Sequence, residues 1–241
     1  MAVQDSKGLI RGAVGNLTFK VVNGRQIIQA RSLDMKQTER TKKSSKIFGK
    51  CSSQATEIRG KLKPWIFGCC DGNVTARFLG ACLRAFKTED NQHLESPNVI
   101  QANMAELAGF EFNVNSPLSN YFDGSVLVFG EPEIGLRVKI PSFIPKKSLR
   151  YPVQCQNVVF KIIVFHSTLG VESSDVILQK EWVIEKDQDL HGEQIFDIDP
   201  ISTQGITMIL VQLLFFKNKS KVGKVFLNNK KLHPMQVVYA R

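Results

Sequence analysis

The stretch Leu17-Thr-Phe-Lys-Val-Val-Asn-Gly-Arg-Gln-Ile-Ile-Gln-Ala30 predicts a β-hairpin near the start of the chain. Asn23-Gly24 is the preferred pair for a two-residue type I′ turn, because both turn positions need a positive φ. Pairing outward from this turn sets Val22 opposite Arg25, and alternate residues then share a face. One predicted face is mainly polar, with Val22 and Ile27 as exceptions. The other is apolar and carries Leu17, Phe19, Val21, Ile28 and Ala30.

An isolated hairpin is marginally stable in water, so this one needs a surface to pack against. That surface is either the protein's own body or a neighbouring subunit, and the sequence leaves both open. If the hairpin packs on a partner, the partner-binding residues are predicted to be Leu17, Phe19, Val21 and Ile28.

Three glycines, Gly8, Gly12 and Gly15, precede the hairpin. They do not form a phosphate-binding loop, because no Gly-Lys-Ser/Thr follows and no helix begins directly after them. Glycine in this setting is expected to allow close backbone approach or to bend a strand.

A basic helix is predicted from Thr38, and its apolar positions recur every three or four residues so that one stripe faces a core. Thr38 or Thr41 can cap its start, and Lys63-Pro64 is expected to end it. The predicted stripe is Ile47, Phe48, Cys51, Ala55, Ile58 and Leu62.

The whole net charge of the protein lies in this N-terminal part. Residues 1–64 contain 14 Lys and Arg against 4 Asp and Glu, a net of +10, whereas residues 65–241 contain 18 of each sign. Clustered cations can neutralise phosphates or meet an acidic protein surface. The residues predicted to contact an anion or nucleic acid are Arg40, Lys42, Lys43, Lys46 and Lys50.

Two further helices are predicted, over 74–86 and 98–108, after which the pattern changes to strands separated by turn residues. The run 206–216 is the most apolar and is expected to be the central strand. The fold class is α+β: an N-terminal β-hairpin and small helical subdomain, then an antiparallel β-sandwich, Ig-like or jelly-roll-like. The predicted domains are 1–37, 38–108 and 109–241. Strands are expected at 109–115, 124–130, 136–141, 153–165, 176–184, 194–198, 206–217, 221–227 and 236–240.

No motif for catalysis, metal binding or a cofactor is found, and we predict no enzyme, no cofactor and no small-molecule substrate. The five cysteines lack Cys-x-x-Cys spacing and are expected to be reduced and mostly buried. Asp197 and Asp199 share a strand face without a partner acid, which indicates a solvated strand end. The isolated histidines are expected on the surface or in loops: His93, His166, His191 and His233.

The N-terminal segment resembles a group of uncharacterised bacterial proteins from Bacteroidota, of about this length. The resemblance covers roughly the first 65 residues and rests on the glycine-spaced run 7–16, on Phe19-Lys20 and Asn23-Gly24, and on the polar-basic segment 38–48. The Asn-Gly hairpin after the glycines departs from the usual pattern of that group. The resemblance implies a basic arm, a helix and a sandwich-like region, and it implies no activity and no site residue.

We therefore predict a non-enzymatic structural or assembly protein that forms a homo-oligomer or a larger assembly through its hairpin arm. The alternative is a nucleic-acid-binding protein that uses the basic segment. A weaker third hypothesis is a carbohydrate-binding sandwich with Trp182, Tyr121 and Tyr151 as platforms, beside Trp65 and Tyr239. Neither a membrane span nor the apolar core of a signal peptide is found, so we expect the protein in the cytoplasm or as a signal-less component of an assembly.

Overall fold

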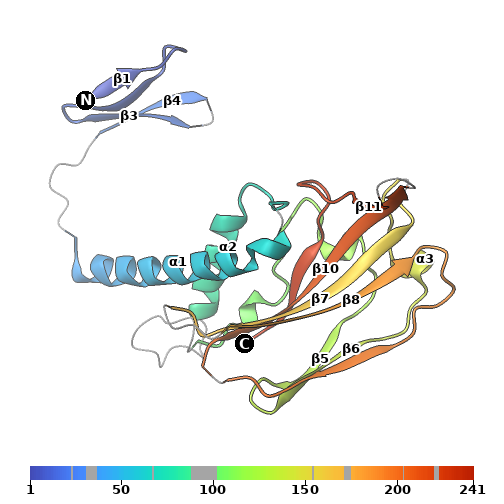
Figure 1. Ribbon diagram of the computed structural model, residues 1–241. Coiled ribbons are helices and arrows are strands. Elements are labelled where there is room, and N and C mark those ends of the chain that lie inside the picture. Colours follow the sequence, from blue (N-terminus) through green and yellow to red (C-terminus); the bar gives the residue numbers. More distant parts are fainter. Residues whose placement is uncertain are drawn as a thin grey trace. The chain divides into compact units, whose positions relative to one another are not determined.

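The computed structural model has the predicted α+β fold, with an N-terminal antiparallel sheet, helices, and antiparallel sheets packed together (Figure 1). The chain divides into two compact units, Met1–Ser45 and Lys46–Arg241. The residues that the structure describes are 1–22, 24–30, 37–66, 68–87, 102–153, 155–170, 175–202, 204–219 and 223–241.

The first unit contains a four-stranded antiparallel sheet whose strands follow one another in chain order. The predicted hairpin is confirmed, because Val22 pairs with Arg25 and Phe19 pairs with Ile28. Two strands of the sheet precede the hairpin and were not predicted, because β1 has only three residues and Gly12 interrupts the alternation of apolar and polar residues in β2. The four strands are β1 (Ala2–Gln4), β2 (Ile10–Val14), β3 (Leu17–Val22) and β4 (Arg25–Ala30).

Gly12 allows β1 to lie close to β2, as expected for a glycine in this region. Its φ is +114°, and a Cβ built on it would lie 2.4 Å from the carbonyl oxygen of Met1. The turn between these strands is closed by Asp5, whose Oδ1 accepts from the backbone N–H groups of Lys7 and Leu9 at 2.9 and 3.0 Å. These side-chain bonds add to the backbone hydrogen bonds of the turn, from Asp5 to Leu9 and from Gly8 to Asp5.

Helix α1 (Glu39–Ile66) begins where the sequence predicted, because Oγ1 of Thr38 accepts from the N–H of Thr41 at 3.2 Å. It does not end at Pro64, which lies inside its last turn. Pro64 has no N–H to donate to the carbonyl oxygen of Gly60, and only two residues of the helix follow it. The predicted stripe is buried only from Cys51 onward, at Cys51, Ala55, Ile58 and Leu62, whereas Phe48 is 52% exposed.

The central strand of the second unit is β10 (Ile206–Lys219), as the sequence predicted. One of its edges pairs with β7 along eleven residues, and its other edge pairs with β12 and then with β11. Strand β8 pairs with the far edge of β7 and completes a five-stranded sheet. The bounds are β7 (Asn157–Ser167), β8 (Asp175–Glu185), β11 (Gly223–Phe226) and β12 (Met235–Ala240).

A second, three-stranded sheet packs on one face of the five-stranded sheet, which confirms a sandwich-like C-terminal region (Figure 1). Its order is β5-β6-β9, all antiparallel, and its inward residues Leu136, Val138 and Ile198 are buried. Its strands are β5 (Leu127–Glu131), β6 (Gly135–Ile140) and β9 (Gln194–Ile198), and the short helix α3 (Pro145–Ser148) follows β6.

Helices α1 and α2 (Val74–Phe86) cover the opposite face of the five-stranded sheet (Figure 1). Ile58 and Phe78 from the helices share a core with Met208 and Leu210 of β10. Strand β10 is therefore covered on both faces, which explains its almost unbroken apolar sequence. The body has three layers: helices, five strands and three strands.

The segment between α2 and β5 contains less regular structure than predicted. Residues 98–101 lie outside the described part, and the rest of the predicted third helix holds only a 3-10 turn, η2 (Ala105–Leu107). The predicted strand 109–115 reduces to an isolated bridge between Glu111 and Gln236, with backbone hydrogen bonds from Gly109 and Phe112 to β12. A second 3-10 turn, η3, follows at Leu118–Asn120.

Gly12→Ala is predicted to separate β1 from β2, because its Cβ would overlap the backbone of Met1 and Ala2. We expect faster amide hydrogen exchange at Val3 and Arg11, which pair with each other across β1 and β2. Gly15→Ala is the matched control, since no atom lies within 4 Å of the position that its Cβ would take and only its φ of +54° is strained. Equal exchange in both variants would show that close approach at Gly12 is unimportant.

Candidate functional site

The N-terminal sheet has one uncharged face. The register of the four strands places eleven residues on it, and the only polar ones are Gln4 and Gln26. The side chain of Gln26 reaches across to β2, where it accepts from the N–H of Ile10 at 2.7 Å and donates to its carbonyl oxygen at 2.8 Å. The other nine are Ala2, Ile10, Gly12, Val14, Leu17, Phe19, Val21, Ile28 and Ala30.

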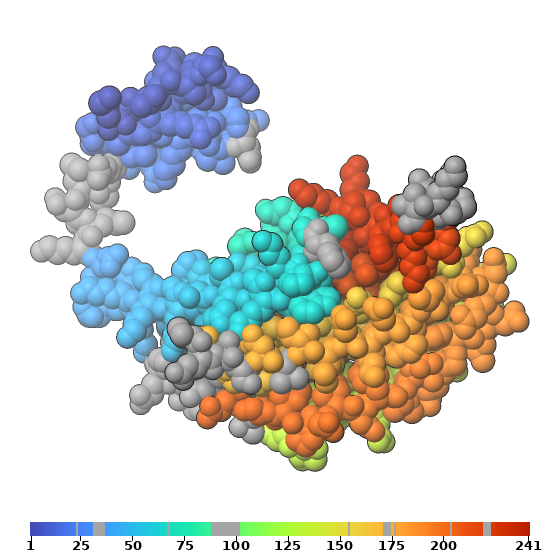
Figure 2. Space-filling view, viewed as in Figure 1, coloured from blue at the N-terminus to red at the C-terminus, as the bar shows by residue number. Residues whose placement is uncertain are grey.

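The four residues predicted to bind a partner all lie on this uncharged face. Leu17 and Ile28 are 38% and 59% exposed, while Phe19 and Val21 are half-buried. None of the described residues 1–30 is fully buried (Figure 2, dark blue). The sheet thus has no closed core of its own, although its strands are paired throughout.

The opposite face of this sheet is cationic. It carries Arg11, Lys20 and Arg25 and no acidic residue among the described strand positions. Ile27, 44% exposed, is paired directly with Lys20 on this face. The two faces therefore differ in kind: one can be buried against an apolar surface, and the other suits water or an anion.

The predicted anion-contacting residues lie in the first three turns of α1, where all five are exposed. Lys42, Lys46 and Lys50 recur every four residues and Lys43 is adjacent, so these four project from one side of the helix. Arg40 lies off this stripe. Lys42 forms an ion pair with Glu39 at 2.8 Å, which offsets part of the positive charge.

The structure corrects the placement of the histidines. His191 and His233 lie in loops, as predicted, but both are buried, whereas His166 is buried within β7. His93 lies outside the described residues. Burial lowers the pKa of His233 to about 4, so its ring is neutral at neutral pH. Its Nε2 lies 3.1 Å from the side-chain amide of Gln212. The periodicity of a strand does not reveal such a polar contact.

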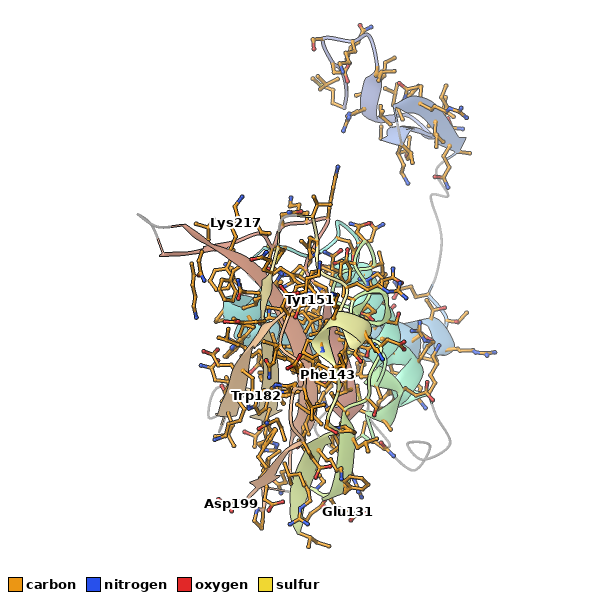
Figure 3. The ribbon with its side chains drawn as sticks, turned by 90° about the vertical axis from the view of Figure 1, so that its right-hand side faces the viewer. Glu131, Phe143, Tyr151, Trp182, Asp199 and Lys217 are labelled. Carbon is orange, nitrogen blue, oxygen red and sulfur yellow. The ribbon has the colours of Figure 1, made fainter. Side chains whose placement is uncertain are left out.

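The carboxylates considered from the sequence occupy an exposed strand end. Asp197 forms a two-point ion pair with Arg137, whose Nε and Nη2 lie 2.6 and 3.1 Å from its oxygens. Both partners are about 60% exposed, so the pair contributes little stability. Figure 3 shows Asp199 and Glu131 together at this end of the body, with Lys217 at the other.

The aromatic residues considered as sugar platforms are partly buried: Trp65 packs on the core beneath the helices, and the other four pack on the core between the two sheets. Tyr121 and Tyr151 both pack against Phe215, with ring centroids 5.6 and 6.2 Å away. Trp182 packs against Phe160 and Phe196 instead. Figure 3 shows Trp182 and Tyr151 in the middle of the body.

A polar cluster that the sequence did not reveal lies beside α2. Asp71, just before the helix, accepts from the backbone N–H groups of Asn73 and Val114 at 2.9 and 3.3 Å and pairs with Arg77. Burial acts to raise the pKa of Asp71, but these hydrogen bonds outweigh it and lower that pKa. Asp71 is therefore ionised and fixes the guanidinium of Arg77, which also lies 5.0 Å from the ring centroid of Phe110.

Glu111 is the unusual member of this cluster. Its Oε1 accepts from the N–H of Leu118 at 3.0 Å and from the side-chain amide of Gln236 at 2.7 Å. Burial raises the pKa of Glu111 to about 7, although these hydrogen bonds and the charge of Arg77 act to lower it. The sequence places these residues far apart, so only the alternation around Phe110 and Phe112 hinted at a packed segment here.

The sequence matches no protein-family model, and no curated protein or solved structure is significantly similar to the chain. In the described part of the chain, no helix combines the length and the apolar character that crossing a membrane requires. The five cysteines form no disulfide among the described residues, and Cys51, Cys82 and Cys155 are buried.

Glu111 is predicted to make the protein less stable as pH rises from about 4.5 to 7. In that window the folded state holds a proton that the unfolded chain has released, so the free energy of unfolding falls as pH rises. Glu111→Gln cannot ionise. The free energy of unfolding of this variant minus that of the wild type should therefore be larger at pH 8 than at pH 5. Because Glu111 is only partly buried, we expect a change on the order of 1 kcal/mol.

Chemical denaturation of both proteins at pH 5 and pH 8 measures this difference. Glu133→Gln, at an exposed position, controls for the loss of one negative charge. A constant difference between Glu111→Gln and the wild type at both pH values would contradict the prediction.

Proposed function

We propose that the protein is a non-enzymatic assembly protein that self-associates or docks on a partner through the uncharged face of its N-terminal sheet. The observation that supports this most strongly is a four-stranded sheet with an apolar face and no fully buried residue. Exposed apolar area of this kind is typical of interaction surfaces.

The arrangement favours packing of sheet against sheet. An uncharged face of alternate strand residues can interdigitate with another apolar face about 10 Å away. Leu17 and Ile28, the more exposed of the predicted contacts, would lose the most water-accessible area on docking. The cationic face, with Arg11, Lys20 and Arg25, would remain outward.

A nucleic-acid-binding function is the second proposal, and the lysine stripe of α1 supports it. Four lysines on one side of an exposed helix can each meet a phosphate and release a counterion. The cationic face of the N-terminal sheet adds further positive charge, but Phe48 is the only aromatic residue beside these lysines that could stack on a base. The expected binding is therefore governed by charge and insensitive to sequence.

Ile28→Glu is predicted to weaken assembly, whereas Ile27→Glu should leave it intact. The two residues are adjacent, but Ile28 lies on the uncharged face and Ile27 on the cationic face opposite Lys20. Losing one buried isoleucine contact costs about 1.5–3 kcal/mol, which corresponds to a dissociation constant roughly 10- to 100-fold larger.

Light-scattering chromatography over a concentration series measures the solution mass of both variants and of a chain lacking residues 1–30. The truncated chain should be a folded monomer. Assembly that persists in the truncated chain, or that Ile27→Glu disrupts as much as Ile28→Glu, would disprove docking through the uncharged face.

Lys42→Glu with Lys46→Glu is predicted to abolish most of any nucleic-acid affinity and to flatten its salt dependence. Removing two phosphate contacts lowers the slope of log affinity against log salt by about 1.4 for single strands and 1.8 for duplex. Fluorescence anisotropy with a labelled oligonucleotide at several salt concentrations measures that slope. Lys146→Glu with Lys147→Glu, on α3, is the charge-matched control, and an equal effect of both pairs would contradict binding by the stripe.

A further inference from the structure

The outer face of the three-stranded sheet is the one sheet face of the body that no other layer covers in the described part of the chain. The five-stranded sheet is covered by the helices on one face and by the three-stranded sheet on the other. Figure 1 shows β5 and β6 on the outside of the body. Packing of sheet against sheet requires an open face of this kind.

The register of β5, β6 and β9 sets which side chains project outward. Leu136 and Val138 of β6 point into the core, so Arg137 and Lys139 of the same strand lie on the outer face. Residues paired directly across the sheet share a face. The outer face therefore also carries Leu127, Phe129, Ile195 and Asp197.

Three of these outward residues are large, apolar and exposed. Leu127 is 38% exposed, and Phe129 and Ile195 are each 51% exposed. Ile134, in the turn between β5 and β6, is 78% exposed. Several large apolar side chains on one open face are typical of a surface that another protein covers.

The charged residues of the outer face are already in ion pairs. The pairs are Arg137–Asp197, Lys139–Glu193 and Glu131–Arg241, with nitrogen–oxygen distances of 2.6, 2.6 and 2.9 Å. An uncharged surface that docks here removes water from these pairs but leaves each charge with its partner. Burying a charge is most costly when its partner is missing, so an uncharged partner suits this face.

The outer face is hollowed beside the turn between β5 and β6. A cleft of about 430 Å³ lies there, and Phe129 and Gly135 are among the residues that line it. Gly135 has no side chain to fill the cleft. The N–H of Ile201 donates to the carbonyl oxygen of Pro132 at 2.7 Å, which ties the loop after β9 to this turn. The cleft can receive an apolar side chain that projects from a docked sheet.

The outer face has acidic surroundings, whereas the N-terminal sheet belongs to a strongly basic unit. Glu133 and Asp199 are exposed beside the face and form no ion pair with a described residue. Residues 1–45 contain nine Lys and Arg against three Asp and Glu, a net of +6. Opposite charges around two apolar surfaces favour their association, whereas two N-terminal sheets would repel each other.

Building on the assembly function proposed above, we propose that the outer face of the three-stranded sheet receives the N-terminal sheet of a second copy of this chain. The uncharged face of the docking sheet packs on Leu127, Phe129 and Ile195. Each copy then has one docking sheet and one receiving face, so the contact is head to tail. Such a contact leaves one of each free at the ends and builds rings or filaments.

Phe129→Glu is expected to raise the dissociation constant of the assembly roughly 10- to 100-fold, as Ile28→Glu does, because each change removes an apolar contact. Phe226→Glu is the matched control and should leave assembly intact. Phe226 is also 51% exposed, but it lies on β11 at an edge of the five-stranded sheet. Light-scattering chromatography over a concentration series measures the solution mass of each variant.

A mixture of the Ile28→Glu chain and the Phe129→Glu chain provides the decisive measurement. The first chain keeps its receiving face, and the second keeps its docking sheet. Neither should assemble alone, but an equimolar mixture should form a 1:1 dimer and stop there, because its remaining sheet and face are both disabled. Ile195→Glu, on the opposite side of the receiving face, should behave like Phe129→Glu in both measurements.

The outcomes separate this proposal from the proposed assembly function. If the wild type assembles but Phe129→Glu and Ile195→Glu do not weaken assembly, or the mixture stays monomeric, the proposed receiving face is wrong and the uncharged face meets another surface. A wild type that is monomeric at every concentration would also overturn the proposal, because the sheet would then dock on another protein or on its own body. Assembly that Ile28→Glu leaves unchanged would disprove both.

Discussion

The body of this protein depends on strand β10 being enclosed on both edges and both faces. Backbone pairing with β7 on one side and with β12 and β11 on the other uses its hydrogen-bonding groups. Its side chains then alternate between two cores: Met208 and Leu210 face the helices, and Ile209 and Val211 face the three-stranded sheet. Each large apolar side chain buried in this way contributes about 1.5–3 kcal/mol. The helical layer and the three-stranded sheet both pack on this strand and on its neighbour β7.

The enclosure of β10 also limits the partners that the few polar residues in the core can bind. Gln212 interrupts the apolar run of β10 and is completely buried. Its amide donates to the carbonyl oxygen of Trp65 in the last turn of α1, one of the carbonyls that a helix end leaves unpaired, and also meets His233. Gln212, a polar residue in an apolar strand, thus joins the helical layer to the sheet. The Asp71–Arg77 pair has a similar role at the start of α2, and Glu111 ties the same region to β12 through Gln236.

The N-terminal sheet differs from the body because its side chains are not enclosed. Its four strands are fully paired, yet none of the described residues 1–30 is fully buried in it. One face is uncharged and the other is cationic, so the sheet is already divided into a surface to cover and a surface to leave in contact with water or anions. The proposed assembly surface would use the apolar area of the uncharged face.

Much of this was determined by the sequence alone. Asn23-Gly24 set the hairpin register, Thr38 marked the start of α1, and the apolar run of β10 marked the central strand, because each signal is local or periodic. The shortness of β1 and the glycine in β2 concealed these strands. The sequence also could not show that the helices and the three-stranded sheet cover opposite faces of one sheet. The surroundings of Glu111 come from Arg77, Leu118 and Gln236, which lie far apart in the chain. Burial and electrostatic contact are properties of the assembled layers, so only the tertiary structure could decide the ionisation of Glu111.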